Sequence, residues 1–294
     1  MTVETNKEKP NKSSRAKKKK IYKIRQMTRK ILLFVSFLLF PITIFYFSPY
    51  LSIIGPAMGI ISGSILIFAG LFVFSLVFGR VFCGWFCPMG GMQEAMATIR
   101  PRRVKKRSFW VKWAIFIPWV LVLIILPLVL MPGWQGFDFF WQVGGKIVVN
   151  EDPYQTMDLT GISIMSLSGV IIYYIVIAVI TILGFTIGRR SFCHHLCWIG
   201  PFMVIGRKIS NWCQIPSMRL TAENENCIKC KRCTRICPMS LEVQENVLRG
   251  DMEDSNCILC GECIKECPKN VIHYTFCSYG KAKTPPISKE LAAK

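Results

Sequence analysis

The sequence predicts a mainly α-helical membrane protein with four transmembrane helices, arranged as two repeated hairpins, and a small C-terminal α+β module. Three observations predict this architecture: long apolar runs, basic segments that alternate with acidic or neutral ones, and a cysteine pattern written twice near the C-terminus. The chain has 294 residues, and its hydrophobic content of 52% exceeds that of an ordinary soluble domain.

Four apolar runs are the candidates for helices that cross a membrane. They cover residues 31–46, 60–78, 113–131 and 170–187. They are nearly free of charge and, with their flanks, long enough to span a bilayer. The second helix opens with Gly55-x3-Gly59-x3-Gly63. This stripe of small residues either packs against another helix or reflects the general abundance of glycine in membrane helices.

The distribution of charge predicts the orientation of these helices. The formal net charge is +20, and the first thirty residues carry twelve Lys or Arg. Eight more lie from Arg80 to Lys112, whereas residues 132–166 hold one base, Lys146, against four acids. This alternation follows the positive-inside rule, so both termini are expected in the cytoplasm. The positive charge is thereby assigned to anionic lipid rather than to nucleic acid.

Composition and motifs divide the chain into five segments. They are a basic cytoplasmic tail (1–30), a four-helix transmembrane domain (31–206), a connector (207–222), a cysteine-rich domain (223–276) and a polar C-terminal tail (277–294). The cysteine-rich segment is short for a core of its own, so metal groups are expected to stabilise it.

The C-terminal cysteines form two runs of identical spacing, Cys-x2-Cys-x2-Cys-x3-Cys-Pro, which end at Pro238 and Pro268. This is the bacterial ferredoxin spacing, in which the fourth cysteine of each run ligates the other [4Fe–4S] cluster. The expected ligands are Cys227, Cys230, Cys233 and Cys267 for cluster 1, and Cys257, Cys260, Cys263 and Cys237 for cluster 2. The alternatives are weaker, because zinc sites do not need this spacing and cytoplasmic thiols stay reduced rather than form disulfides.

A second cysteine pattern follows the second and fourth apolar runs. Cys83 and Cys87 repeat as Cys193 and Cys197, each pair in the pattern Phe-Cys-x3-Cys shortly after Gly-Arg. Cysteines at i and i+4 share one helical face. Two such pairs, brought together by packing of the two hairpins, would offer four thiolates to one redox or metal site. The alternative is that they are buried small hydrophobic residues, as most lone cysteines are.

These motifs together carry a resemblance. Gly-Arg-x-Phe-Cys-Gly-Trp-x-Cys-Pro at Gly79–Pro88, its echo at Gly188–Trp198 and the trailing two-cluster ferredoxin run resemble the NapH family of membrane polyferredoxins. The same core occurs in the membrane half of NosR-type proteins and, more distantly, in the CcoG/RdxA group. The resemblance covers about residues 30–275. The family has a proline after the second cysteine of each motif, but Trp198 follows Cys197 in this chain. Both thiols are present, so the difference affects the expected turn after Cys197 and not the cysteines.

The resemblance implies an electron-transfer subunit of the bacterial inner membrane. Its cofactors would be two [4Fe–4S] clusters, and it would exchange electrons between the quinone pool and a partner iron–sulfur protein or cytochrome of an anaerobic respiratory reductase. The alternative is a CcoG-like assembly factor whose thiol pairs hold or reduce copper. His194 and His195, between the thiols of the second pair, fit either a proton relay or an ordinary interfacial role. Cys213 and Cys277 lie outside every motif and are expected to be free thiols.

Overall fold

The computed structural model describes residues 12–44, 46–57, 59–104, 110–130, 136–139 and 167–282. The start of the predicted N-terminal tail, most of the predicted acidic loop and most of the predicted C-terminal tail lie outside the described residues.

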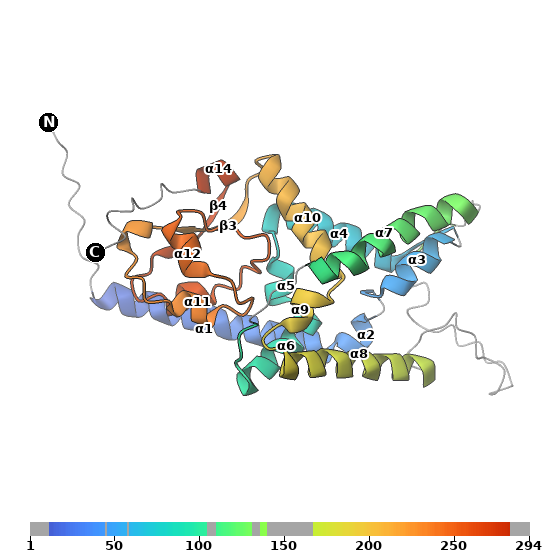
Figure 1. Cartoon of the computed structure of the whole chain (residues 1–294), viewed down its shortest axis with the longest axis horizontal. Coiled ribbons are helices and arrows are strands. Elements are labelled where there is room, and N and C mark those ends of the chain that lie inside the picture. The colour runs from blue at the N-terminus through green and yellow to red at the C-terminus, as the bar shows by residue number, and fades with distance from the viewer. Residues whose placement is uncertain are drawn as a thin grey trace.

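The described chain up to Trp212 is mainly helical (Figure 1). Its elements are α1 (Lys12–Leu38), α2 (Phe40–Thr43), α3 (Pro49–Ala57), β1 (Ile60–Ser62), α4 (Gly63–Phe78), α5 (Val81–Trp85), α6 (Pro88–Ile99), α7 (Trp110–Leu130), β2 (Gly136–Asp138), α8 (Leu167–Thr186), α9 (Ser191–His195) and α10 (Ile199–Trp212). The short strands β1 and β2 pair in parallel. Helix α4 packs on α10, α6 on α1 and α8, and α3 on α7.

Helix α1 begins at Lys12, so much of the predicted basic tail is helical. Lys, Arg and Gln favour helix, and tertiary contacts hold this segment, because Gln26 and Arg29 are buried. The helix runs beneath the C-terminal module before it reaches the apolar half (Figure 1). The predicted helix 31–46 is broken near Pro41, where α1 ends and α2 begins, because proline cannot donate the helical hydrogen bond.

The glycine stripe does not lie on one helical face, contrary to the sequence prediction. Gly55 lies in α3, Gly59 adopts a φ of +73° in the turn that follows, and Gly63 begins α4. Gly63 instead permits a close backbone approach, because a Cβ there would collide with the Phe139 carbonyl oxygen.

Among the described residues, one helix is long and apolar enough to cross a membrane, α7 over Trp110–Val129. Helix α4 and the apolar segment Tyr173–Thr186 of α8 are shorter. The four transmembrane helices therefore remain a prediction from the sequence.

The C-terminal module combines short helices with a two-stranded sheet. Its elements are β3 (Ser217–Ala222), the 3-10 turn η1 (Asn224–Asn226), α11 (Arg232–Ile236), α12 (Val243–Leu248), α13 (Glu262–Glu266), β4 (Ile272–Cys277) and α14 (Tyr279–Ala282). Strands β3 and β4 pair antiparallel, from Ser217 opposite Cys277 to Ala222 opposite Ile272. The predicted connector is thus part of the fold, since it completes α10 and supplies β3.

The molecule has two hydrophobic cores, one in the C-terminal module and one among the helices. Helices α5 and α9 lie between them (Figure 1). Cys83 of α5 and Cys193 of α9 belong to the module's core, whereas Cys87 and Cys197 belong to the helical core. The second cysteine pattern therefore sits where the two halves meet.

Candidate functional site

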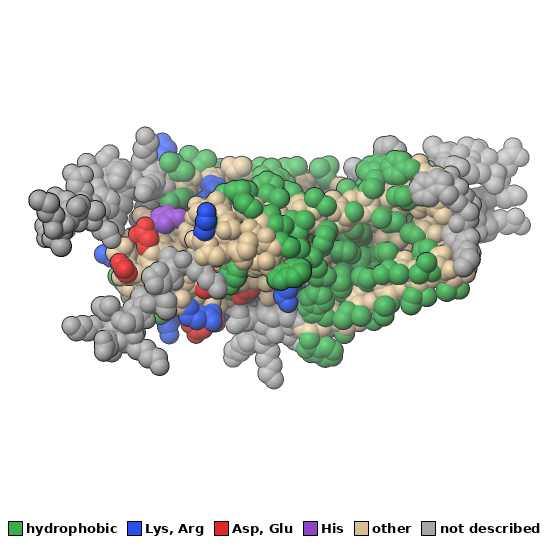
Figure 2. Space-filling view, turned by 90° about the horizontal axis from the view of Figure 1, so that it is seen from above, with side chains coloured by type: hydrophobic (Ala, Val, Ile, Leu, Met, Phe, Trp, Pro, Cys, Tyr) green, Lys and Arg blue, Asp and Glu red, His purple; other side chains and the backbone are tan. Residues whose placement is uncertain are grey.

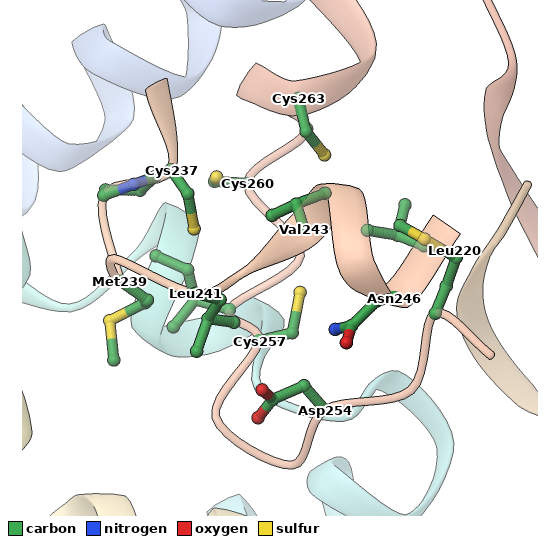
Figure 3. A pocket seen from close by; sticks show the side chains of 14 residues that line it. Leu220, Cys237, Met239, Leu241, Val243, Asn246, Asp254, Cys257, Cys260 and Cys263 are labelled. Carbon is green, nitrogen blue, oxygen red and sulfur yellow. The ribbon is translucent and has the colours of Figure 1, made fainter. Parts of the chain in front are cut away.

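Four cysteines from the two C-terminal runs line one cavity (Figure 3). This inner set comprises Cys237, Cys257, Cys260 and Cys263. Cys237 comes from the first run, directly after α11, and the other three come from the second run. Figure 3 shows the sulfur atoms of Cys237, Cys257 and Cys263 pointing toward the space between them, with Leu220 and Val243 among the apolar walls.

The other four ferredoxin cysteines line a second cavity. This outer set comprises Cys227, Cys230, Cys233 and Cys267. Cys267 comes from the second run and the other three from the first. The fold therefore groups the eight cysteines as a crossed ligand pattern requires. Lys231 and Lys269 also border this cavity, so its rim is basic.

The two runs adopt the same backbone conformation, repeated after thirty residues. Positive φ angles occur in three corresponding pairs: Lys229 and Leu259, Lys231 and Gly261, and Ser240 and Asn270. Left-handed residues turn neighbouring N–H groups toward one side of the chain, which creates a concave site for anions. Accordingly, the amides of Leu259 and Glu262 donate to the thiols of Cys257 and Cys260.

The inner set is buried more deeply than the outer set. Three of its cysteines, Cys237, Cys260 and Cys263, are 9%, 7% and 8% exposed, whereas Cys257 and every outer cysteine are half-buried. Burial raises the pKa of Cys237 to about 12, so its free thiol keeps its proton at neutral pH. Metal binding must displace that proton. The outer set lies closer to solvent.

The cysteines that follow α4 and α8 form a third group, the hairpin quartet, made of Cys83, Cys87, Cys193 and Cys197. All four are buried. In each pair the first cysteine lies in a short helix and the second precedes the next helix, so the two do not share one helical face. The chain turns between them, where the N–H groups of Cys87 and Cys197 donate to the carbonyls of Phe82 and Phe192, both at 3.0 Å. The turn survives the loss of proline at Trp198, whose indole N–H bonds instead to the Phe47 carbonyl at 2.8 Å.

The inner set is docked directly on the first hairpin motif. The indole N–H of Trp85 donates to the Leu259 carbonyl at 3.2 Å. Gln26 of α1 donates to the Cys260 carbonyl at 2.8 Å. A Cβ at Gly84 would collide with the Ile258 carbonyl oxygen, so glycine is required for this contact. The neighbours of Cys83 thus touch the neighbours of Cys257 and Cys260.

A buried ionic cluster joins α1, α6, α9 and α13. Glu94 pairs with Arg29 and, at 2.7 Å, with Arg190, and Arg29 also pairs with Glu262 at 3.0 Å. Burial alone would raise the pKa of Glu94, but Arg190 and Arg29 lower it to about 2. The sequence analysis missed this cluster, although Glu94 carries a signal as the sole Asp or Glu among residues 9–137.

The remaining candidates from the sequence, two histidines and two cysteines, differ in burial and in their contacts. His194 is buried, and His195 Nδ1 lies 2.9 Å from the Ser191 carbonyl oxygen. Cys213 is exposed and Cys277 half-buried in β4, and all fourteen cysteines are free of disulfides. In the described ranges, no three His, Cys, Asp or Glu side chains are close enough to hold a metal ion, a statement that covers all three cysteine groups.

Comparison with protein families assigns the two cysteine patterns to two related models. A 4Fe–4S dicluster domain matches residues 226–272, which contain both ferredoxin runs. A 4Fe–4S binding domain matches twice, at residues 63–107 and 169–215, which contain the two hairpin motifs. The chain carries 4Fe–4S ferredoxin-type domains. The double match also supports the internal repeat of the two hairpins.

Relatives among known proteins agree with an iron–sulfur electron-transfer function. The chain is 26% identical to an uncharacterised protein of Methanocaldococcus jannaschii over 60% of this chain and 65% of that protein. It is 21% identical to the putative electron transport protein YccM of Escherichia coli, over 67% and 52% of the two chains. It is 26% identical to the methylamine utilization ferredoxin-type protein MauN of Methylorubrum extorquens, over 60% and 54%.

The chain thus spans between about half and two thirds of the length of these relatives. No solved structure matches it. The matches support a polyferredoxin-type protein in general, and the NapH-like assignment remains a prediction.

Proposed function

We propose that the chain is an electron-transfer subunit anchored in the bacterial inner membrane. It moves electrons between the quinol pool and a partner redox protein of an anaerobic respiratory reductase, as NapH-like proteins do. One observation carries the proposal: the inner cysteine set sits directly on the motif at the end of the apolar helix α4. That placement suits a path between a membrane donor and a cytoplasmic module.

The outer set, Cys227, Cys230, Cys233 and Cys267, is proposed to hold cluster 1, and the inner set, Cys257, Cys260, Cys263 and Cys237, cluster 2. When bound, such clusters supply one-electron transfer. The chain positions the thiols on two matched turns, donates backbone N–H groups to sulfur and excludes water from the inner cavity. Hydrogen bonds to sulfur and burial both tune the reduction potential.

Membrane anchoring is supported by apolar surface. Helix α7 is long enough to span, and its side chains are largely exposed rather than packed in a core: Leu121, Leu128 and Val129 are 51%, 65% and 71% exposed. Figure 2 shows hydrophobic side chains covering the helical end and charged side chains at the module end. Such an apolar surface marks contact with lipid or protein. The first described helix, α1, begins at the module end in Figure 1, and the last described helix, α14, lies there too, which fits the proposed cytoplasmic side.

The outer set offers the proposed exit to a partner iron–sulfur protein or cytochrome. Its cysteines are half-buried, and Ile228 beside Cys227 is 54% exposed. An exposed apolar residue near a redox group is a suitable contact for a transient partner. The direction of electron flow follows from the donor, which we propose to be quinol.

Anaerobic reduction tests this function. Purified protein in detergent is mixed with menaquinol or ubiquinol, with partner subunits present, and the visible absorbance of the clusters is followed. Bleaching by quinol, and by dithionite as a positive control, is expected. Clusters that dithionite reduces but neither quinol reduces would overturn the quinol dehydrogenase role.

A second candidate function is a CcoG-like metal-reducing or assembly factor, favoured by the burial of the four hairpin thiols. Anaerobic copper titration separates the two. If Cys83→Ser with Cys193→Ser abolishes copper binding and leaves quinol-driven reduction untouched, the thiols serve copper. If copper does not bind to the unmodified protein, the assembly role fails.

A further inference from the structure

We propose that the two hairpins jointly hold a third iron–sulfur cluster, on Cys83, Cys87, Cys193 and Cys197. Each match to the 4Fe–4S binding domain contains too few grouped cysteines for a cube, since the one other cysteine in either match, Cys213, is exposed at the far end of α10. The other hairpin offers the missing pair, because Cys83 and Cys193 belong to one buried core and Cys87 and Cys197 to the other. The proposal does not depend on the identity of the electron donor.

The two motifs share more than their cysteines. Both have the pattern Arg-x2-Cys-x3-Cys-x2-Gly, from Arg80 to Gly90 and from Arg190 to Gly200. Both fold into a short helix, a turn with the same pair of backbone hydrogen bonds, and a second helix. A site built from both motifs would therefore take two thiols from each of two similar backbone turns.

Each arginine reaches across to the opposite motif. Arg190 donates to the Cys83 carbonyl at 2.7 Å, and a Cβ at Gly90 would lie 3.0 Å from its Nη1. A Cβ at Gly200 would lie 3.4 Å from Arg80 Nη2 and 3.9 Å from Cys197 Sγ. The glycines thus keep side chains away from the positions where the thiols of one motif meet the arginine of the other.

Of the two arginines beside the quartet, Arg190 is paired with Glu94, whereas Arg80 has no carboxylate partner among the described residues. Arg80 is 1% exposed, and within the described ranges no carboxylate pairs with it and its Nε has no hydrogen-bond partner. Its charge acts on Cys83, Cys193 and Cys197. A buried cation is costly unless an anion or a ligand compensates it. A cube with four thiolates carries net negative charge and would compensate Arg80 where neutral thiols cannot.

The surroundings of the quartet are apolar and contain a further sulfur atom. Cys83 Sγ lies 3.4 Å from the sulfur of Met203, and the quartet is divided between the two hydrophobic cores. The thiols therefore surround the boundary between the halves from both sides. A cluster there would lie between the inner set and the apolar helices, on the path that the proposed function needs.

The test is a count of iron and acid-labile sulfide in anaerobically purified full-length protein. Three cubes would give about twelve of each per chain, and two cubes about eight. The double variant Cys87→Ala/Cys197→Ala is expected to lower both counts by about four, while the spectra of the ferredoxin clusters persist. The control Cys213→Ala, an exposed cysteine of the same domain match, is expected to leave both counts unchanged.

Two results would overturn the proposal. The first is a count of about eight irons in the unmodified protein, which decides the question whether or not the variant folds. The second is extra iron without extra sulfide, or bound copper or zinc in its place, which would mean a single-ion site. If the variant loses all iron through misfolding, Mössbauer spectra of the unmodified protein still give the number of cubes.

Discussion

At the scale of single residues, the site depends on charges that composition alone obscures. In a basic chain, Glu94 is surrounded by cations, yet only Arg29 and Arg190 form ion pairs with it among the described residues. Arg29 in turn holds Glu262 of α13 and the Gly84 carbonyl. One carboxylate thereby ties the first helix, both hairpin motifs and the inner cysteine set into one unit.

Glu94→Gln is expected to destabilise the protein by about 3 kcal/mol or more, because it leaves the buried Arg190 without an anion and the buried Arg29 with Glu262 alone. The thermal unfolding midpoint in detergent, followed by circular dichroism, measures the loss. The matched control is Glu242→Gln, whose ion pair with Arg103 is 41% and 32% exposed. That change is expected to cost at most about 1 kcal/mol. Equal losses in both variants would contradict the role of the cluster.

The same ion pairs predict a pH dependence. The pKa of Glu94 falls from 4.5 to about 2 in the folded protein, so its contribution is complete above pH 4.5 and is lost as pH falls toward 2. The difference in unfolding midpoint between the unmodified protein and Glu94→Gln should therefore stay constant from about pH 6 to 8. A difference that shrinks over this range would show that the carboxylate titrates near neutrality instead.

Crossed ligation makes a prediction for Cys267, which lies in the second run but lines the outer cavity. Cys267→Ser should alter the same cluster as Cys227→Ser, so the two variants should give matching changes in the electron paramagnetic resonance spectrum. Cys257→Ser should alter the other cluster. Cys277→Ser, outside both cavities, should change neither. A Cys267→Ser spectrum that matches Cys257→Ser would show that each run holds its own cluster.

At the scale of elements, spacing in the sequence predicted the cysteine groups better than the shapes that hold them. The repeated spacing predicts that Cys237 acts with the second run and Cys267 with the first, and the two cavities are lined by cysteines in that grouping. It did not reveal that Cys83 lies in α5 while Cys87 precedes α6, because periodicity indicates a helical face and not the turn at Phe86 that interrupts it. Nor did composition reveal that 12–30 is helical, since contacts with a distant module stabilise it.

Docking of the module on α5 depends on the absence of a side chain at Gly84. Gly84→Ala places a Cβ against the Ile258 carbonyl and is expected to destabilise the protein by about 1–3 kcal/mol through overpacking. The loss of stability should appear as faster cleavage of the C-terminal module in limited proteolysis. Gly70→Ala in α4 is the control, since nothing lies within 4 Å of its Cβ, and alanine favours helix. If the Gly84→Ala variant were as resistant to limited proteolysis as the Gly70→Ala variant, the close contact at Gly84 would be contradicted.

At the scale of the whole molecule, the two halves are joined by polar contacts as well as by the shared cysteine region. Glu253 of the module receives hydrogen bonds from Arg207 Nε and Nη2 of α10, at 2.7 and 2.6 Å, and pairs with Arg219 at 3.0 Å. Lys112 at the start of α7 donates to Asn256 at 2.9 Å. These basic residues explain why the sequence places positive charge where apolar helices meet the module. The same charges give the predicted cytoplasmic side a structural role in addition to lipid contact.

The orientation can be tested with thiols at opposite ends of the molecule. Cys213, exposed at the end of α10, should react with a membrane-impermeant maleimide in inverted vesicles and not in intact spheroplasts. Phe137→Cys, placed in β2 at a residue that is 57% exposed, should show the reverse in a Cys213→Ser background. The reason is that α7, the helix long enough to span, separates β2 from the basic segment before Trp110. Labelling of both positions from the same side would show that α7 does not cross the membrane, and the proposed anchoring would fail while the cluster assignments would stand.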